Sequence, residues 1–389
     1  MLFIKDKKHI ETINVLMNLG NLGLCQVLKG TIVAVFPKLL PLYFTVQFFG
    51  STIQGSISDI YKRSTILNLA LVILIIFPTA LLLTHNSHNI FSKIIQFSSA
   101  VFIALGGNAD VVGRASIIDI RYQEFRRKVM SLTVFAEAFS WVIIGFFIRY
   151  FHLEPINILI TCIASAVLLL VISLLYNIDQ VSDKKELHNP IHEMKLILKS
   201  HYQKFLGITL ILIFVALGYF YFFYSQEDSI TKNDTVKNKI ILADTYLSWF
   251  ISMSLGCFLP MHFKKFTDFT LLAIGIFTIF LGVCLFIFTG MKPVTSDFII
   301  DTIAYFTVGL GSGICLPSFY SIISNGQSIH FQGILTGWID SIRGFGDAFS
   351  TLTLVGISSY LNLATYLSCS FLILSLIVLF LYRNKIQTS

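Results

Sequence analysis

Charged residues are scarce in this chain. Asp, Glu, Lys and Arg make up 13% of its 389 residues, whereas an average soluble domain contains about 25%. This shortage excludes an ordinary soluble globular protein. The alternating pattern and glycine-rich turns of a β-barrel are also absent, so an outer-membrane barrel is excluded as well.

The sequence also lacks the common motifs of enzymes and of ATP-driven pumps. It contains no HExxH, no Ser–His pairing, no metal-ligand cluster and no Gly-x-x-x-x-Gly-Lys-Ser/Thr loop. We therefore expect no enzyme activity, no cofactor and no bound metal, and ATP does not drive the protein directly. No small-residue cleavage site follows the basic start, MLFIKDKKHIETINVL, so we expect no cleavable signal peptide.

Cysteines are few and lie within apolar segments without metal-ligand spacing, so we interpret them as small hydrophobic residues. The six are Cys25, Cys162, Cys257, Cys284, Cys315 and Cys369.

Long apolar segments are abundant instead, and hydrophobic residues make up 55% of the chain. A membrane-spanning helix needs about 20 predominantly apolar residues. The sequence predicts an all-α polytopic membrane protein with twelve such helices. They cover 10–30, 36–58, 64–84, 91–119, 129–150, 155–176, 203–226, 239–262, 269–290, 297–324, 330–358 and 361–382.

Lys and Arg gather in the loops on one side of these predicted helices. Cytoplasmic loops of membrane proteins carry an excess of basic residues, so both termini are predicted to be cytoplasmic. The net charge of +7 follows from this orientation and does not require a nucleic-acid partner. The basic residues on that side include Lys5, Lys7, Lys8, Lys184, Lys185, Lys195, Lys199, Lys264, Lys265, Arg383 and Lys385.

The chain divides into two similar halves. A polar segment over 177–202 separates six predicted spans from six others, which gives an N-terminal bundle over 1–176 and a C-terminal bundle over 203–389. LGGNADVVG in span 4 has a counterpart in VGLGSGICLP in span 10, and Glu137 and Asp340 lie at similar depths. Such internal repeats indicate a secondary transporter with its binding site near the repeat interface.

The loop after span 2 reads GSISDIYKRS and contains Gly55, Asp59, Lys62 and Arg63. It resembles the Gly-x-x-x-Asp-x-x-x-Arg-Arg/Lys signature of the major facilitator superfamily, with its basic residues displaced by one position. EFRRK, which includes Arg126, resembles the basic stretch that follows span 4 in that family. The resemblance implies two pseudo-symmetric six-helix bundles that rock around a central binding site and open it to each side of the membrane in turn.

The same resemblance implies a cytoplasmic gate that latches the outward-open state. Gly55 would let two helices approach closely, and Asp59 would cap a helix N-terminus, where the dipole favours an anion. The basic side chains would pair with acids at the cytoplasmic end of span 4. The alternative is an ordinary positive loop. The gate comprises Gly55, Asp59, Lys62, Arg63, Asp119 and Arg126.

Five charged residues deep inside predicted spans are candidates for substrate binding and proton coupling. They are Asp110 and Arg114 in span 4, Glu137 in span 5, and Asp340 and Arg343 in span 11. Asp110 and Arg114 are four residues apart and can pair on one helix face, as can Asp340 and Arg343 at a spacing of three. Glu137 has no local basic partner, which suits a proton carrier. Each group could instead serve packing alone.

Three other features are open to two interpretations. The row Asn14, Asn18 and Asn21 in span 1 can bind a polar solute or hold helices together. GLGSGICLP in span 10 predicts a flexible helix beside the cavity, or tight packing. GYFYFFY in span 7 predicts an aromatic belt at the membrane interface, with a cavity wall as the alternative.

Together these features predict proton-coupled uptake of a small polar organic solute by a monomer in a bacterial inner membrane. Span 5 lacks the Gly-x-x-x-Gly-Pro-x-x-Gly-Gly pattern of drug–proton antiporters. Span 4 resembles amino-acid importers of intracellular bacteria, the phagosomal transporter type, which favours an amino acid. The alternatives are proton-driven efflux of a siderophore or drug, and a non-transporting receptor on a transporter fold.

Overall fold

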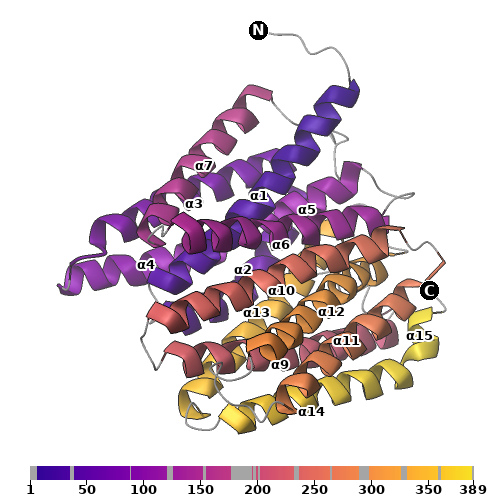
Figure 1. Ribbon diagram of the computed structural model, residues 1–389. Coiled ribbons are helices and arrows are strands. Elements are labelled where there is room, and N and C mark those ends of the chain that lie inside the picture. The colour runs from indigo at the N-terminus through magenta and orange to yellow at the C-terminus, as the bar shows by residue number, and fades with distance from the viewer. Residues whose placement is uncertain are drawn as a thin grey trace. The chain divides into compact units, whose positions relative to one another are not determined.

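The computed structural model describes most of the chain as helix (Figure 1). The described residues are 7–35, 39–87, 89–120, 126–151, 155–176, 195, 199, 202–231, 236–262, 265–288, 298–325, 331–357 and 361–387. The helices of the first part are α1 (Lys7–Val35), α2 (Leu40–Ile60), α3 (Arg63–Thr84), α4 (Ile90–Gly106), α5 (Ala109–Ile120), α6 (Arg126–Phe151) and α7 (Pro155–Tyr176). Those of the second part are α9 (Tyr202–Thr231), α10 (Val236–His262), α11 (Asp268–Phe288), α12 (Phe298–Ser324), α13 (Gln332–Ile357), α14 (Leu361–Leu381) and α15 (Arg383–Gln387).

These helices lie where the sequence predicts spans, and the protein is an all-helical, multi-pass membrane protein. In the described part of the chain, seven helical segments are both long and apolar enough to cross a bilayer. They correspond to α3, α4 with α5, α7, α9, α11, α12 and α14. The total of twelve spans stays a prediction.

The predicted span over 91–119 is interrupted. α4 ends at Gly106, and α5 begins at Ala109. The side chain of Gln54 from α2 fills the gap in the backbone hydrogen bonds: its Nε2 donates to the Gly106 carbonyl at 2.8 Å, and its Oε1 accepts from the Asn108 N–H at 2.9 Å. Because unpaired backbone groups are costly in hydrocarbon, this amide makes the break tolerable.

The chain forms two compact units. Unit 1 contains Met1–Val129, Glu154–Ile197 and Gln327–Ser341, and unit 2 contains Met130–Leu153, Leu198–Gly326 and Ile342–Ser389. α6 therefore belongs to unit 2 from Met130 onward, and α13 begins in unit 1 and ends in unit 2. The division at the 177–202 linker stays a prediction, since that linker lies almost entirely outside the described residues.

Tight backbone contacts hold the helices of unit 2 together. A Cβ on Gly309 or Gly313 of α12 would collide with the backbone of Trp249 or Met253 on α10, and one on Gly311 would collide with Gly275 on α11. Small residues allow such approaches between membrane helices. The glycine run in span 10 thus packs closely, and Ser312, Cys315 and Leu316 of the same segment also line a cavity; the predicted flexibility stays a prediction.

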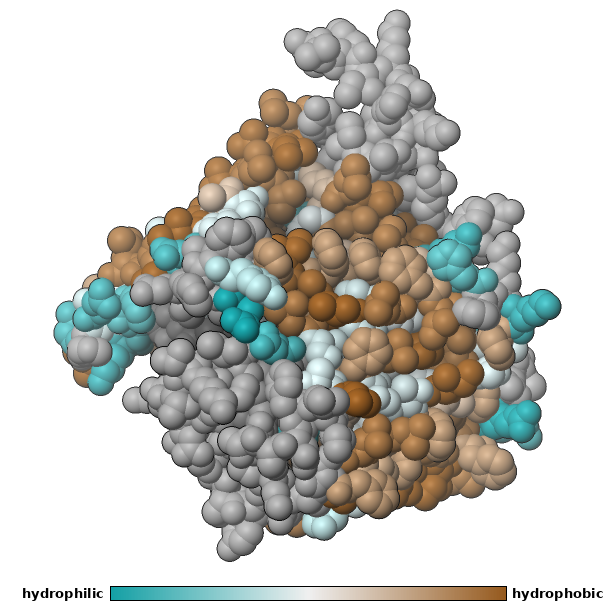
Figure 2. All heavy atoms as spheres, in the orientation of Figure 1, coloured by the Kyte–Doolittle hydropathy of each residue, from teal (hydrophilic) through white to brown (hydrophobic). Residues whose placement is uncertain are grey.

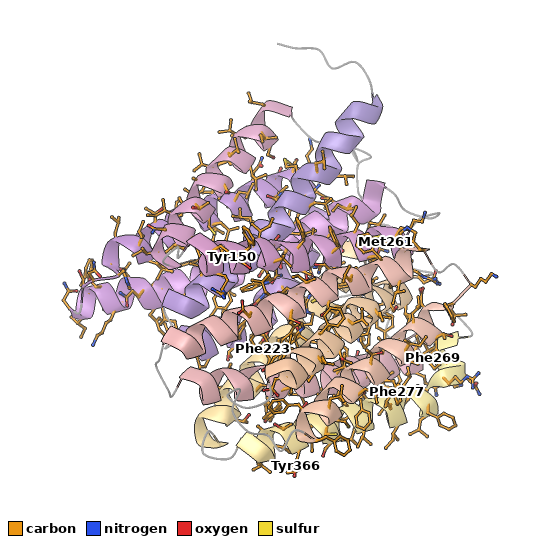
Figure 3. All side chains as sticks on the ribbon, in the orientation of Figure 1. Tyr150, Phe223, Met261, Phe269, Phe277 and Tyr366 are labelled. Carbon is orange, nitrogen blue, oxygen red and sulfur yellow. The ribbon has the colours of Figure 1, made fainter. Side chains whose placement is uncertain are left out.

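The aromatic run in span 7 lies inside unit 2. Phe222 is fully buried, and the Trp249 ring lies 4.8 Å from Tyr219 and 4.7 Å from Phe223, ring centroid to ring centroid. Phe223 is labelled in Figure 3. The predicted interface belt is wrong for these residues, because they pack in the core against α10, α11 and α12. Tyr219 and Phe220 line a cavity there, as the alternative interpretation predicted.

Large apolar side chains also cover the outside of the protein. Leu83, Phe288 and Phe380 are each more than three-quarters exposed, and apolar residues, in brown, dominate the described surface in Figure 2. Such a surface suits contact with lipid, as expected for a membrane protein.

Candidate functional site

The α4–α5 break places Asp110 in the first turn of α5. The positive end of a helix dipole lies there and stabilises an anion. The carboxylate is buried, and its Oδ2 accepts a hydrogen bond from Gln26 Nε2 of α1 at 3.4 Å. A carboxylate deep in the protein is thus held by a helix terminus and a polar neighbour.

Arg114 lies one turn further along α5 and pairs with an acid from another helix. Its Nη1 donates to Asp340 Oδ2 of α13 at 2.5 Å, and the two side chains are 0% and 7% exposed. The sequence predicted pairs within helices, between Asp110 and Arg114 and between Asp340 and Arg343. The observed pair joins residues 226 positions apart, which local spacing cannot reveal.

A second pair, with a buried carboxylate and a partly buried guanidinium, lies in unit 2. Arg343 Nη1 of α13 is 3.4 Å from Glu137 Oε2 of α6, and it also donates to the Tyr320 hydroxyl at 3.3 Å. Glu137 is 3% exposed. The expectation of an isolated carboxylate at Glu137 is therefore wrong, because a basic partner comes from a distant part of the chain.

Each pair includes one residue of α13. Asp340 and Arg343 are three residues apart and so lie on neighbouring positions of one helix face. Asp340 binds within unit 1 and Arg343 binds within unit 2. One helix thus carries the acid of one pair and the base of the other.

The residues of the signature loop meet the start of α13. Asp59 accepts from the backbone N–H groups of Gly333 and Ile334 at 2.9 and 2.8 Å, and Arg63 Nη2 lies 2.7 Å from its Oδ1. This is the helix N-terminal cap predicted for Asp59. The carboxylate is held by the helix terminus and by a guanidinium from its own loop.

Glycines bring α2 and α13 into backbone contact below this cap. A Cβ on Gly55 would collide with the Gly333 carbonyl, and one on Gly337 would collide with the Ser51 carbonyl. The hydroxyls of Thr52 and Ser341 lie 2.7 Å apart.

Among the other residues assigned to the gate, Lys62 is exposed. The side chains of Asp119 and Arg126, also assigned to the gate, lie outside the described part of the structure.

The asparagines of α1 are all buried in unit 1. Asn18 Nδ2 donates to the Asn14 carbonyl in the same helix at 2.9 Å, and a Cβ on Gly113 of α5 would lie 3.4 Å from Asn18 Oδ1. The side-chain amides of Asn14 and Asn21 have no hydrogen-bond partner among the described residues. Both interpretations, solute binding and helix packing, stay predictions.

A cavity lies among the helices of unit 2. It encloses about 380 Å³ of space free of atoms, its open side included. Arg343 contributes the single charge of its lining, and Tyr219 and Ser312 contribute hydroxyls. The other lining side chains are Leu212, Val215, Ala216, Phe220, Ile279, Cys315 and Leu316. A further ion pair, Arg149 with Asp244 at 2.8 Å, joins α6 and α10 and is about one-third exposed.

Among the residues that the structure describes, no group of three or more His, Cys, Asp or Glu could hold a metal ion.

Comparison with known families gives one match. Residues 29–351 match the model of the Major Facilitator Superfamily, which is most of the chain. No curated protein matches the sequence.

Solved structures of transporters share the fold. The human organic anion transporter MFSD10 (TETRAN) superposes with a TM-score of 0.71 at 11% identity, over 95% of this chain and 99% of that one. A bacterial homologue of the iron transporter ferroportin, in an outward-facing state, superposes with a TM-score of 0.69 at 14% identity, over 96% and 99%. At these identities the likeness concerns the fold.

Proposed function

Because this chain belongs to the major facilitator superfamily, we propose that it is a proton-coupled secondary transporter that takes up a small polar organic solute, with an amino acid favoured. The observation that carries the proposal is the presence of two arginine–carboxylate pairs, one buried and one partly buried, inside predicted membrane-spanning helices. Alternating access is the mechanism that this fold uses.

Buried charges are energetically costly in a membrane protein. Each costs on the order of 2.5–3.5 kcal/mol at the centre of a spanning helix on insertion scales, and pairing offsets part of that cost. Ionisable residues in such positions usually mark a substrate or proton pathway. When a pair is formed in one conformation and open in another, a proton or a substrate binds the two conformations with different affinities. Coupling requires such a difference in affinity.

The residues divide into roles. Glu137 or Asp110 accepts the proton, and Arg114 or Arg343 binds a substrate carboxylate or competes for the acid. Before a substrate carboxylate binds, Asp340 pairs with Arg114. Fixed charges of both signs suit a zwitterion, whose carboxylate meets a guanidinium and whose ammonium meets a carboxylate. This chemistry favours an amino acid.

The α2–α13 contact serves as the cytoplasmic gate. It contains Gly55, Asp59 and Arg63, with Lys62, Asp119 and Arg126 as its further members. We place the monomeric protein in a bacterial inner membrane with both termini in the cytoplasm, because the basic loops fall on that side.

Transport into liposomes tests the proposal. The purified protein is reconstituted, and uptake of a labelled amino-acid mixture is measured with and without an inward proton gradient. Accumulation should depend on the gradient. Glu137→Gln should abolish the dependence, because an amide cannot carry a proton. Asp268→Asn, an acid-to-amide change at the start of α11 in the same unit, is the matched control and should retain it.

Two other results would point elsewhere. Export of a siderophore or drug under an inverted gradient, without amino-acid uptake, would reverse the direction of transport. Unchanged ligand binding after neutral substitution of Asp110, Arg114 and Glu137, with no transport of any kind, would indicate a receptor.

A further inference from the structure

Two cysteines lie against each other on α11 and α14 of unit 2. The sulfur atoms of Cys284 and Cys369 are 3.9 Å apart. Both side chains are partly exposed, whereas the other four cysteines of the chain are buried. A disulfide bond is about 2.05 Å long, so each sulfur has to move by only about 1 Å toward the other. Rotation of the two side chains can supply that movement.

The surroundings of this cysteine pair are apolar and open to the outside of the protein. Leu281 and Leu285 on α11 are 42% and 36% exposed, and Tyr366 and Ile373 on α14 are 52% and 43% exposed. Tyr366 is labelled at the edge of the ribbon in Figure 3. A small neutral oxidant such as hydrogen peroxide crosses membranes, so it can reach the two thiols from this side.

The depth of the pair follows from the positions of the cysteines in their helices. With both termini in the cytoplasm, α11 begins on the cytoplasmic side and α14 begins on the opposite side. Cys284 lies 16 residues after Asp268 and Cys369 lies 8 residues after Leu361, which correspond to about 24 Å and about 12 Å of helix. In a hydrocarbon core about 30 Å thick, both thiols lie in the half that faces outward. The compartment on that side of a bacterial inner membrane is oxidising.

We propose that Cys284 and Cys369 are a reversible oxidation site, at which a peroxide joins the two thiols in a disulfide. One thiol, as its thiolate, attacks a peroxide oxygen, and the O–O bond breaks. The proton lost by that thiol joins the leaving hydroxide, so a sulfenic acid and one water form. The second thiol attacks the sulfenic sulfur, forms the S–S bond and releases a second water. The two thiols lose two electrons, and the peroxide gains them.

The disulfide would fasten α14 to α11. At present α14 also packs on α9, where the Ser368 hydroxyl donates to the Gly218 carbonyl at 2.5 Å. A bond between positions 85 apart closes a large loop of the unfolded chain, and disulfides stabilise mainly by restricting the unfolded state. Oxidation should therefore raise the melting temperature by about 4–8 °C. This effect does not depend on the proposed transport function, because neither cysteine has a role in it.

Thiol counting on the purified full-length protein in detergent tests the site. The protein is reduced with dithiothreitol, freed of the reductant and treated with hydrogen peroxide, and its thiols are then titrated in denaturant. The count should fall from six to four and return to six after renewed reduction. The chain should keep the mobility of a monomer on a non-reducing gel, and peptide mapping should find the segments around Cys284 and Cys369 joined.

Variants locate the bond. Cys284→Ser should form no disulfide within the chain, and peroxide should no longer raise its melting temperature. Cys162→Ser is the matched control, because it removes a buried thiol from α7 in unit 1. Its thiol count should still fall by two and recover on reduction. Circular dichroism and size-exclusion profiles identify any variant that fails to fold.

Three results would overturn the proposal. The first is a thiol count that stays at six after peroxide treatment. The second is a reversible loss of two thiols that persists in folded Cys284→Ser, which would place the bond elsewhere. The third is a loss that dithiothreitol does not restore, because the thiols would then oxidise to sulfinic acid instead of pairing. A mapped cross-link with an unchanged melting temperature would refute the fastening of α14.

Discussion

Removing one charge from the Arg114–Asp340 pair should destabilise the protein strongly. Asp340→Asn leaves a guanidinium with 0% side-chain exposure without the carboxylate that neutralises it. Breaking a buried pair from one side costs about 3–5 kcal/mol. At about 2 °C per kcal/mol for a large domain, the melting temperature should fall by about 6–10 °C.

The assay is thermal unfolding of the purified protein in one detergent, followed by tryptophan fluorescence. Asp244→Asn is the matched control, because it makes the same change in a pair that is about one-third exposed, and solvent screens such pairs. Its melting temperature should change far less. A double variant, Arg114→Met with Asp340→Leu, should recover much of the loss, since an apolar pair of similar volume can replace a buried ion pair.

Equal shifts for Asp340→Asn and Asp244→Asn would refute this reasoning. They would mean that water or another group neutralises the charge of Arg114 in the variant. Burial of the pair would then not determine how much stability is lost when it is broken. A double variant that is less stable than Asp340→Asn would also contradict this reasoning. It would mean that the shape of the two side chains matters for stability and that their charge is dispensable.

Three further changes probe the helix contacts of unit 1. Gly55→Ala should destabilise the fold by about 1–3 kcal/mol through overpacking, seen as a lower melting temperature, whereas Gly20→Ala should be tolerated because its Cβ would meet only Leu169 Cδ2 at 3.4 Å. Asp59→Asn should weaken the cap of α13 and lower the proteolytic resistance of that helix end, since an amide lacks the second acceptor oxygen and the charge; unchanged cleavage would contradict this. Gln54→Leu should cost about 1–3 kcal/mol for each backbone group left unpaired at the α4–α5 break, measured by thermal unfolding; a melting temperature equal to that of the native protein would show that another group replaces the amide.

The sequence was sufficient for features that depend on composition or on short motifs. Apolar segments of about 20 residues predict the helices, and the spacing of Gly55 and Asp59 predicts a close approach and a cap, both of which are present. These features are local, because each follows from residues within one or two helical turns.

Features that depend on which helices become neighbours were not predictable in the same way. The i,i+4 spacing of Asp110 and Arg114 shows that they share a face, but not that an acid from α13 reaches Arg114. Glu137 lacked a basic residue nearby in sequence, and its partner lies 206 positions away. The aromatic run near Tyr219 has the composition of an interface belt, and only packing against Trp249 shows otherwise.

The Gln54 amide has a wider consequence for how this protein can move. A primary amide can donate and accept hydrogen bonds at the same time, as a peptide group does, so Gln54 supplies from α2 the two bonds missing between α4 and α5. The joint between these helices therefore has no continuous backbone ladder to resist bending. α5, with only 12 residues, can tilt about this joint while α4 keeps its place, and Asp110 and Arg114 would travel with it.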